Sequence, residues 1–361
     1  MINCLSIKVT GRTTHYYLSD NVKPYILGIE SSCDDTSAAV LHGEFLLSNV
    51  IAGQEVHQAY GGVVPEFASR AHQQNIVPVV DQALQQAKIH KKQLSAIACT
   101  QGPGLLGSLL VGTSFAKALS LSLGIPLINV DHMDAHILAH FIRTESNPEK
   151  KVPEFPFLCL TVSGGHTQIA VVNGPFQADV IGRTIDDAAG ETFDKAAKIL
   201  GLPYPGGVMI DKLAVGGNPR AFAFSEPRIA GFDYSFSGLK TSILYFVRDR
   251  IKEDPDFIQK HLSDLCASVQ HAIVAALMKK LRAAAKHTGI KGVAIAGGVS
   301  ANTALRAALT AAGQEQGWTV FIPELIYSTD NAAMIAMAGL FSYREGHFAN
   351  QGDTAYARKM K

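Results

Sequence analysis

The chain has 361 residues, of which 47% are apolar and only 17% charged, and it contains 32 glycines and 15 prolines. This composition excludes a disordered chain and favours a globular protein with many tight turns. A single core stops growing at about 250 to 300 residues, so two domains are expected. The 32 Lys and Arg residues balance 31 Asp and Glu residues, which restricts any RNA contact to local basic patches.

The cysteines and the apolar runs bear on the compartment. The five cysteines are widely scattered and form no CxxC motif, which argues against a disulfide framework and a thiolate zinc site. The longest candidate for a membrane span, residues 105–130, is interrupted by Lys117 and several serines. Residues 1–24 lack the apolar stretch of a signal peptide, and we interpret them as an extension outside the fold. We therefore expect a cytoplasmic protein without a membrane segment.

The first elements in chain order indicate a helix-covered sheet. An apolar strand at 25–30, a polar turn at 31–36 and an apolar run at 37–41 predict a hairpin. The elements expected next are a helix at 66–87, a strand at 95–100, a glycine-rich turn, a helix at 105–123 and a strand at 126–130. Strands that alternate with helices predict a largely parallel sheet in an α/β fold.

A polar stretch with three prolines, residues 143–156, is the clearest linker and places a domain boundary near residue 145. The segment 157–172, with SGGHT at its turn, predicts a second hairpin with the layout of the first. This is a weak repeat of pattern, and two unrelated hairpins would look the same. The remaining expected elements are a helix at 190–200, a Gly/Pro loop at 201–207, helical segments from Asp211 and at 256–287, strands at 292–296 and 319–322, and an apolar helix at 331–343.

Two histidines directly after the strand at 126–130 are candidate metal ligands. His132 and His136 are four residues apart, so both imidazoles leave the same face of a helix that Asp131 or a preceding residue can start. His140 continues the stripe but lies about 12 Å from His132, too far to share one ion with both histidines. A solvated polar stripe would explain an isolated HxxxH equally well. The position after an apolar strand, where α/β sheets gather ligands, favours the metal.

Two histidines need a further ligand, and a carboxylate would complete a set suited to iron or zinc. Asp330 in STDNAAM is the candidate, although a role as N-cap of the following helix would also explain it. HxxxH also resembles the HExxH of metalloproteases, in which the glutamate is the general base. Met133 occupies that position here and cannot accept a proton, so this sequence gives poor support to a peptidase.

A glycine-rich turn offers an alternative interpretation as a dinucleotide-binding oxidoreductase. Gly102, Gly104 and Gly107 match GxGxxG between a predicted strand and a predicted helix. Pro103 lies within the turn, however, and Asp131 opens the histidine helix instead of standing free for a ribose. We prefer a tight turn that lets the helix pack closely on the strand.

Two further glycine turns shift the balance toward nucleotide chemistry. In SGGHT, Gly164 and Gly165 let consecutive backbone N–H groups face one anion, although a plain hairpin turn has the same sequence. AGGVSAN at 296–302 follows a strand and opens a helix, whose N-terminus and Asn302 amide could meet a nucleotide. No GxxxxGK[ST] motif is present, so a bound nucleotide would not be held by a P-loop.

The remaining polar candidates each have a structural explanation beside the functional one. Asp194 and Asp211 lie at or near expected helix starts, where they could cap the helix or accept hydrogen bonds from ribose hydroxyls. Cys33 is the obvious candidate nucleophile, but a small apolar side chain in a hairpin turn is the better interpretation. The catalytic residue therefore remains unassigned.

Ten segments, taken in order from residue 25 to residue 357, resemble one family. They are ILGIESSCDDTSAAV, GGVVPEFASRAH, TQGPGLLGSLLVG, DHMDAH, TVSGGHT, IDDAAGETFDKAAK, LPYPGG, YSFSGLKTS, IAGGVSAN and YSTDNAAMIA. Together they resemble the TsaD family of tRNA N6-adenosine threonylcarbamoyltransferases, once described as sialoglycoprotein endopeptidases. Residues 1–24 lie outside the resemblance.

The resemblance implies an α/β fold of two ribonuclease-H-like lobes, of the actin, Hsp70 and sugar-kinase type, with a central ligand cleft. The first lobe would span 25–145 and be completed by 326–361, and the second would span 146–325. The implied activity moves a threonylcarbamoyl group from its adenylate to N6 of the adenosine 3′ of the anticodon, in tRNAs reading codons that begin with A, and releases AMP. The implied helpers are a metal-free paralogue (TsaB-like) and a P-loop ATPase (TsaE-like).

Carried over position by position, the resemblance assigns His132, His136 and Asp330 to one divalent metal ion per chain, with iron(II) as first choice and zinc as second. The substrate-binding set that it implies is Thr161, Val162, Ser163, Gly164, Gly165, Asp194, Gly207, Asp211 and Asn302. Departures from the family pattern are Asp134, Val208 and His140, of which His140 leaves open an alternative ligand pairing. A nucleotide-binding scaffold and a metal-dependent peptidase are the alternative functions.

Overall fold

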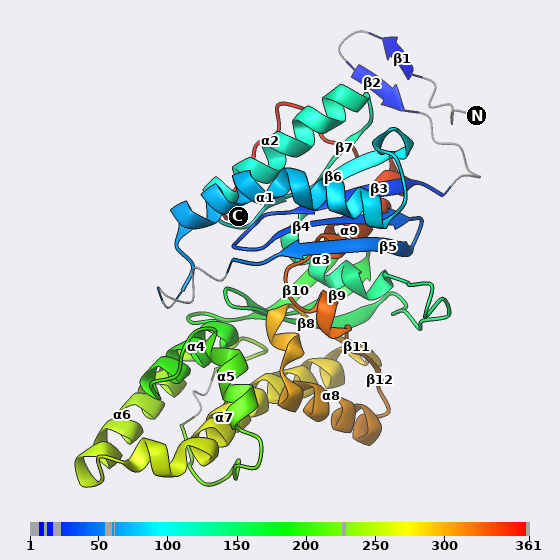
Figure 1. The fold of residues 1–361 in the computed structure, drawn as a ribbon. Coiled ribbons are helices and arrows are strands. Elements are labelled where there is room, and N and C mark those ends of the chain that lie inside the picture. Colours follow the sequence, from blue (N-terminus) through cyan, green and yellow to red (C-terminus); the bar gives the residue numbers. More distant parts are fainter. Residues whose placement is uncertain are drawn as a thin grey trace. The chain divides into compact units, whose positions relative to one another are not determined.

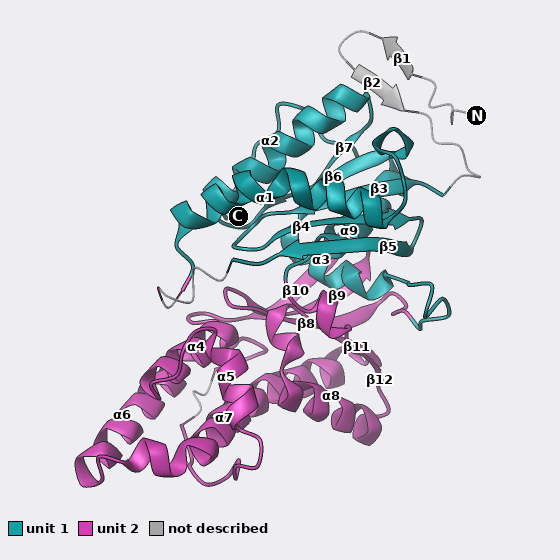
Figure 2. Cartoon of the chain, viewed as in Figure 1, with its two compact units in different colours: residues 1–54, 63–151, 330–361 teal, residues 55–62, 152–329 magenta. Residues whose placement is uncertain are grey.

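The computed structural model describes residues 7–10, 13–16, 23–54, 60, 62–225 and 229–358. The expectation that residues 1–24 extend outside the fold falls mainly outside these described residues. The described part includes the paired strands β1 (Ile7–Thr10) and β2 (Thr13–Tyr16). The chain divides into two compact units (Figure 2). Unit 1 comprises residues 1–54, 63–151 and 330–361, and unit 2 comprises residues 55–62 and 152–329.

Unit 1 contains a five-stranded sheet with the order β5-β4-β3-β6-β7 (Figure 1). Its first three strands form an antiparallel meander, to which β6 and β7 add in parallel. The strands are β3 (Tyr25–Glu30), β4 (Thr36–His42), β5 (Phe45–Ala52), β6 (Ala96–Gly102) and β7 (Leu127–Asp131). The helices are α1 (Pro65–Gln86), α2 (Leu106–Leu123), α3 (His132–Leu138) and α9 (Ala332–Glu345), with the 3-10 turns η2 (Lys91–Gln93) and η3 (Ala139–Phe141).

Unit 2 contains a sheet with the corresponding order β10-β9-β8-β11-β12, in which β8 to β10 are antiparallel and β11 and β12 add in parallel. The strands are β8 (Phe157–Val162), β9 (Thr167–Gly174), β10 (Gln177–Arg183), β11 (Gly292–Ala296) and β12 (Thr319–Phe321). The helices are α4 (Ala189–Ile199), α5 (Gly206–Leu213), α6 (Ser237–Glu253), α7 (Phe257–Thr288) and α8 (Thr303–Gln316), with η4 (Gly298–Ala301) and η5 (Leu325–Tyr327).

The two sheets therefore repeat one topology, and this confirms the predicted α/β fold with two ribonuclease-H-like halves. The two predicted hairpins are β3–β4 and β8–β9, so their shared layout is a true structural repeat. The prediction missed the third strand of each meander, β5 and β10, and it also missed α6.

Alternating residues of the central strand explain how helices cover both faces of the unit 1 sheet. Leu27 and Ile29 of β3 are buried in a cluster with residues of α1 and α2. Gly28 points to the opposite face, where a Cβ atom would lie 2.3 Å from the carbonyl oxygen of Ala332 in α9. This period of two is that of a strand buried on both faces. It places α9, which begins two residues after Asp330, directly against the strand that ends at Glu30.

One helix among the described residues, α2, is long and apolar enough to cross a membrane by length and composition alone. Core helices of globular proteins pass the same test. In unit 1 this helix packs against α1 and β6. Its other side leaves large apolar side chains exposed, at Leu106, Leu110 and Leu121.

Candidate functional site

The metal candidates of unit 1 begin where β7 passes directly into α3. Asp131 is the N-cap of α3, and its Oδ1 accepts hydrogen bonds from the amides of Met133 (2.9 Å) and Asp134 (3.3 Å). His132 is the first residue of the helix and His136 follows one turn later, as the spacing predicts. The α-helix ends at Leu138, and His140 lies in η3, so the continuous helical stripe expected through His140 is not formed.

Asp330, about 200 residues later in the chain, lies beside the two histidines. Asn331, not Asp330, caps α9, because the Asn331 Oδ1 accepts the amide of Met334 at 3.1 Å. The Asp330 carboxylate is therefore free of the capping role that would have explained it structurally. Its Oδ1 lies 3.3 Å from His132 Nε2 and 3.2 Å from His136 Nε2.

The three side chains have the geometry of a metal site. Their candidate ligand atoms all lie within 4.8 Å of one another. The two imidazole planes are nearly perpendicular, at 88°. Two histidines and one carboxylate form a donor set for a divalent ion such as iron or zinc.

The burial and charge of these three side chains also suit a bound cation. The His136 side chain is only 1% exposed, and its Nδ1 has no hydrogen-bond partner among the described residues, so its polar contact is at Nε2. Burial alone would lower the pKa of His132, but the carboxylates of Asp330 and Glu30 raise it well above its ordinary value. Burial would likewise raise the pKa of Asp330, yet the two histidines hold it below its ordinary value. The carboxylates thus favour positive charge at this point, which a bound divalent ion would supply.

Glu30 is a buried carboxylate beside the candidate metal site that the sequence interpretation missed. It ends β3, is fully buried, and its Oε2 lies 3.0 Å from His132 Nδ1. The same carboxylate accepts hydrogen bonds from the Thr100 hydroxyl (2.8 Å) and the Ser32 amide (2.5 Å). Because Nδ1 of His132 is held by Glu30, its Nε2 is left to face the metal position. The signal in the sequence was an acidic residue at the end of an apolar strand, where burial demands a partner.

Replacing Glu30 by Gln is expected to weaken metal binding about tenfold, the lower end of the effect for partners of metal-binding histidines. The amide keeps the size of the side chain but removes the charge that orients His132. Titration of the metal-free protein with iron(II) or zinc against a chelating dye measures the dissociation constant. Glu44→Gln, in a partly exposed ion pair with Arg143 and Arg344, is the matched control and should leave the dissociation constant unchanged. Equal affinities in both variants would exclude this role for Glu30.

In unit 2, the predicted SGGHT turn joins β8 to β9. Thr161 and Val162 are buried at the end of β8, whereas Gly164 and Gly165 are exposed. A Cβ atom on either glycine would meet no atom within 4 Å, so packing does not require glycine there. Glycine then leaves open backbone for the close approach of a ligand. The Gly190 amide in the first turn of α4 donates to the Ser163 carbonyl at 3.3 Å, which places a helix N-terminus beside this turn.

Asp194 has a different structural role from the one expected. It lies in the middle of α4, and its Oδ1 accepts the amides of Gly206 (2.9 Å) and Gly207 (3.2 Å), the first two residues of α5. It therefore caps another helix instead of its own. Burial raises the pKa of Asp194, and the two glycine amides partly offset that rise.

Asp211 repeats this arrangement one helix further along. It lies within α5 and not at its start, and it accepts hydrogen bonds from the Thr303 amide (3.2 Å) and hydroxyl (2.7 Å) at the start of α8. Asn302 is the N-cap of α8, with its Oδ1 on the Leu305 amide at 3.0 Å. Its amide group donates to Asp211 (3.2 Å) and to Gln270 (2.9 Å), so it is already engaged within the protein.

The predicted substrate-binding residues of unit 2 thus lie at helix N-termini and at one edge of the sheet. Thr161 of β8 pairs with Ala296 of β11, so the turns that follow these parallel strands leave the same edge. At Gly297 a Cβ atom would lie 2.5 Å from the Val162 carbonyl oxygen, which shows how closely the two turns approach. This edge is where α/β sheets bind ligands.

The GxGxxG turn serves packing, which agrees with our preference over a dinucleotide fingerprint. A Cβ atom on Gly102 would lie 2.2 Å from the Tyr356 carbonyl oxygen, and one on Gly104 would lie 2.5 Å from the Ser32 carbonyl oxygen. The space that these glycines leave is therefore filled by the chain itself. Asp131, which would hold the ribose in a dinucleotide site, caps α3.

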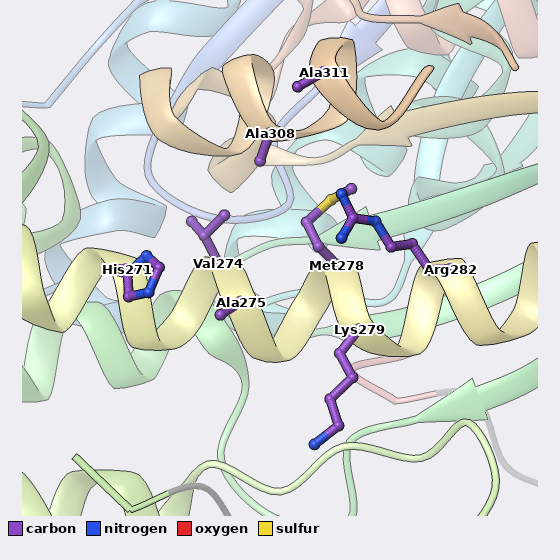
Figure 3. A pocket seen from close by; sticks show the side chains of 8 residues that line it. All are labelled: His271, Val274, Ala275, Met278, Lys279, Arg282, Ala308 and Ala311. Carbon is purple, nitrogen blue, oxygen red and sulfur yellow. The ribbon is translucent and has the colours of Figure 1, made fainter. Parts of the chain in front are cut away.

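A groove of about 460 Å³ lies between α7 and α8 in unit 2 (Figure 3). Its lining residues are His271, Val274, Ala275, Met278, Lys279, Arg282, Ala308 and Ala311. Most of these are apolar or paired, as Arg282 is with Glu315 at 3.1 Å. None belongs to the predicted metal or substrate sets, so we do not assign the groove to the reaction.

Comparisons with known proteins identify the family of this chain. Residues 45–337 match the family model TsaD, described as tRNA N6-adenosine threonylcarbamoyltransferase. Relatives with that name from Porphyromonas gingivalis and Christiangramia forsetii are 64% and 61% identical, covering 90% and 92% of this chain and 94% and 97% of their own. A HypF structure from T. kodakarensis, 14% identical with a TM-score of 0.57, covers 90% of this chain and 48% of its own and shares the fold. The chain belongs to the TsaD family of tRNA N6-adenosine threonylcarbamoyltransferases.

Proposed function

We propose that this chain transfers the threonylcarbamoyl group from threonylcarbamoyl-adenylate to N6 of the adenosine 3′ of the anticodon, in tRNAs reading codons that begin with A. Besides family membership, the observation that carries the proposal is the convergence of His132, His136 and Asp330 on one point. A nucleotide-binding scaffold would not need this set. A peptidase of the HExxH type would need a general base where this chain has Met133.

The metal that we propose is iron(II), with zinc as the second choice. Two histidines and one carboxylate are typical of iron(II) sites with open positions, and the same donors also bind zinc. Asp330 is the most exposed of the three, at 30% of its side chain, so the site is accessible from that side. The ion would supply Lewis-acid polarisation of the donor's carbonyl group.

Two acidic side chains of unit 1 orient the proposed metal ligands. Glu30 holds His132 Nδ1, and Asp131 fixes the first turn of α3. The exocyclic amine of adenine is a weak nucleophile, because its lone pair is conjugated with the ring. The reaction therefore depends on an activated donor and on positioning.

In unit 2, we propose that the backbone of Ser163, Gly164 and Gly165 and the N-terminus of α4 bind the phosphate of the adenylate, with Thr161 and Val162 at the base of the turn. The rest of the proposed substrate-binding set is Asp194, Gly207, Asp211 and Asn302. In the step itself, the amine nitrogen forms a bond to the carbonyl carbon and the bond from that carbon to the phosphate oxygen breaks. The amine releases one proton to water, and AMP leaves as an anion, which amide donors stabilise.

We also propose that the enzyme works in the cytoplasm with two helper proteins, a metal-free paralogue and a P-loop ATPase. The exposed apolar side chains Leu106, Leu110 and Leu121 of α2 are the feature of unit 1 that we assign to a protein partner. A partner that covers this side of α2 would explain a surface helix of such apolar composition.

A reconstituted reaction tests the proposal. The iron-loaded chain, both helpers, threonylcarbamoyl-adenylate and a tRNA transcript with adenosine 3′ of the anticodon should yield the modified nucleoside by mass spectrometry. A transcript with guanosine at that position should stay unmodified, and a chelator should stop the reaction. Omitting either helper should lower turnover. Binding of the adenylate without transfer by the complete metal-loaded mixture would favour the scaffold, and cleavage of a glycoprotein by the pure chain would favour the peptidase.

A further inference from the structure

Residues 350–358, which we call the strap, lie along the end of β6 in unit 1. The Tyr356 amide donates to the Gln101 carbonyl at 3.0 Å, and the Gly104 amide donates to the Ala357 carbonyl at 3.2 Å. The Gln101 side chain also donates to the Thr354 carbonyl at 3.0 Å. These bonds join parts of the chain that are about 250 residues apart, as the separation of 253 between Gln101 and Thr354 shows.

A second set of contacts holds the other end of the strap. The Asp353 carboxylate accepts hydrogen bonds from the Asn129 side chain in β7 and from the Asn350 amide, both at 3.0 Å. The Asp353 carbonyl accepts a hydrogen bond from Lys117 of α2. The strap is therefore tied to β6 and β7, which contact α3, and to α2.

The QGPGLLG turn is shaped to receive this strap. At Gly102 a Cβ atom would lie 2.2 Å from the Tyr356 carbonyl oxygen and 2.7 Å from its ring. A residue with a side chain would therefore displace the strap. This contact explains one of the glycines that mimic a dinucleotide fingerprint.

Tyr356 connects the strap to the metal-binding helix. Its hydroxyl donates to Asp131 Oδ2 at 2.9 Å, while Asp131 Oδ1 caps the amides of Met133 and Asp134. Both oxygens of the cap are thus held, one by the helix and one by the strap. Burial and the neighbouring Asp131 raise the pKa of Tyr356, so the hydroxyl stays protonated as a donor. His132, the first residue of α3, follows Asp131 directly.

We propose that Tyr356 is a positioning residue for the metal centre, which it orders by fixing the Asp131 cap at the start of α3. The proposal rests on the proposed metal site and goes beyond it, because Tyr356 touches neither a metal ligand nor substrate. Its hydroxyl acts through Asp131 on the orientation of the first turn, where His132 must meet His136 and Asp330. A purely structural strap would need only the tyrosine ring and the backbone bonds.

Tyr356→Phe is the test, because it removes the hydroxyl and keeps the ring against Gly102. We expect metal binding to weaken about tenfold, the lower end of the range for groups that support metal-binding histidines. In the metal-free protein, the amides of Met133 and Asp134 should exchange with deuterium severalfold faster, because their cap is less ordered. Tyr245→Phe, an exposed tyrosine in unit 2 (52%), is the matched control and should change neither measurement.

A double mutant separates the hydroxyl from general damage. In an Asp131→Ala background the acceptor of the tyrosine hydroxyl is absent, so adding Tyr356→Phe should weaken metal binding no further. Unchanged affinity and unchanged amide exchange in Tyr356→Phe would overturn the proposal. If the wild-type chain itself binds no metal, the proposed function fails, and the amide exchange still reports whether Tyr356 orders the cap.

Discussion

His136→Ala is expected to remove the bound metal and to lower threonylcarbamoyl transfer at least about a hundredfold, because Lewis-acid stabilisation of a transition state is worth several kcal/mol. The variant leaves His132 and Asp330 as the remaining ligands of the set. Metal content after purification, by mass spectrometry, and single-turnover transfer from threonylcarbamoyl-adenylate to tRNA measure the two effects. Loss of both together would link the ion to the chemistry.

His140→Ala is the matched control, since it removes a second buried histidine from the same segment. His140 is 3% exposed and lies in η3, outside the set whose ligand atoms lie within 4.8 Å of one another. The variant should keep its metal, and comparing the two thermal midpoints separates ligand loss from loss of packing. Metal loss in His140→Ala but not in His136→Ala would establish the alternative ligand pairing that the sequence left open. Full activity of His136→Ala would contradict the proposed role of the ion.

Two parts of the candidate metal site differ in how far the sequence predicts their geometry. A spacing of four residues places His132 and His136 on one helical face whatever the rest of the chain does. Asp330 was ambiguous between ligand and N-cap until the structure showed that Asn331 caps α9. Glu30 was missed because its contact with His132 depends on the order of β3, β6 and β7 in the sheet, which no local pattern encodes.

The missed elements are those whose burial is least regular. β5 and β10 are edge strands, and β10 buries only one of its seven residues, so neither shows a clean alternation of apolar and polar side chains. In α6 the buried residues are only Leu239, Ile243 and Val247, and a charged surface hides their helical spacing. A narrow apolar stripe of this kind is recognised only when the packing partner is known.

The capping aspartates illustrate a second limit of sequence reasoning. Capping was a correct chemical interpretation of Asp194 and Asp211, but both were assigned to their own helices. In the structure each binds the N-terminus of another helix. Asp194 of α4 caps α5, and Asp211 of α5 caps α8. The residue type predicts which backbone groups a carboxylate will bind, whereas only the tertiary fold decides which helix supplies them.

The double substitution Gly164→Ala, Gly165→Ala is expected to lower kcat/KM for threonylcarbamoyl-adenylate about a hundredfold while the fold stays intact, because a small misplacement of a bound donor can cost that much. A Cβ atom on either glycine meets nothing within 4 Å, so the added methyl groups would occupy only the space that a ligand needs. Steady-state kinetics with varied donor, together with a thermal melt of each variant, measure both effects. Gly174→Ala at the far end of β9 is the matched control, because its Cβ atom would make an ordinary contact of 3.5 Å with Gln177.

The two variants separate a ligand cradle from a plain hairpin turn. If the SGGHT turn is only a connection between β8 and β9, both variants should keep their kinetics and their thermal midpoints. If it cradles the donor phosphate, only the Gly164 and Gly165 substitutions should raise KM. The thermal midpoint should stay within a few degrees of the parent in both variants, because exposed substitutions cost about 0.5 kcal/mol or less and the Cβ atom at the buried Gly174 would make only an ordinary contact. Unchanged kinetics in the double variant would remove the turn from the binding site and leave the N-terminus of α4, where Gly190 meets Ser163, as the remaining anion-binding element at that edge.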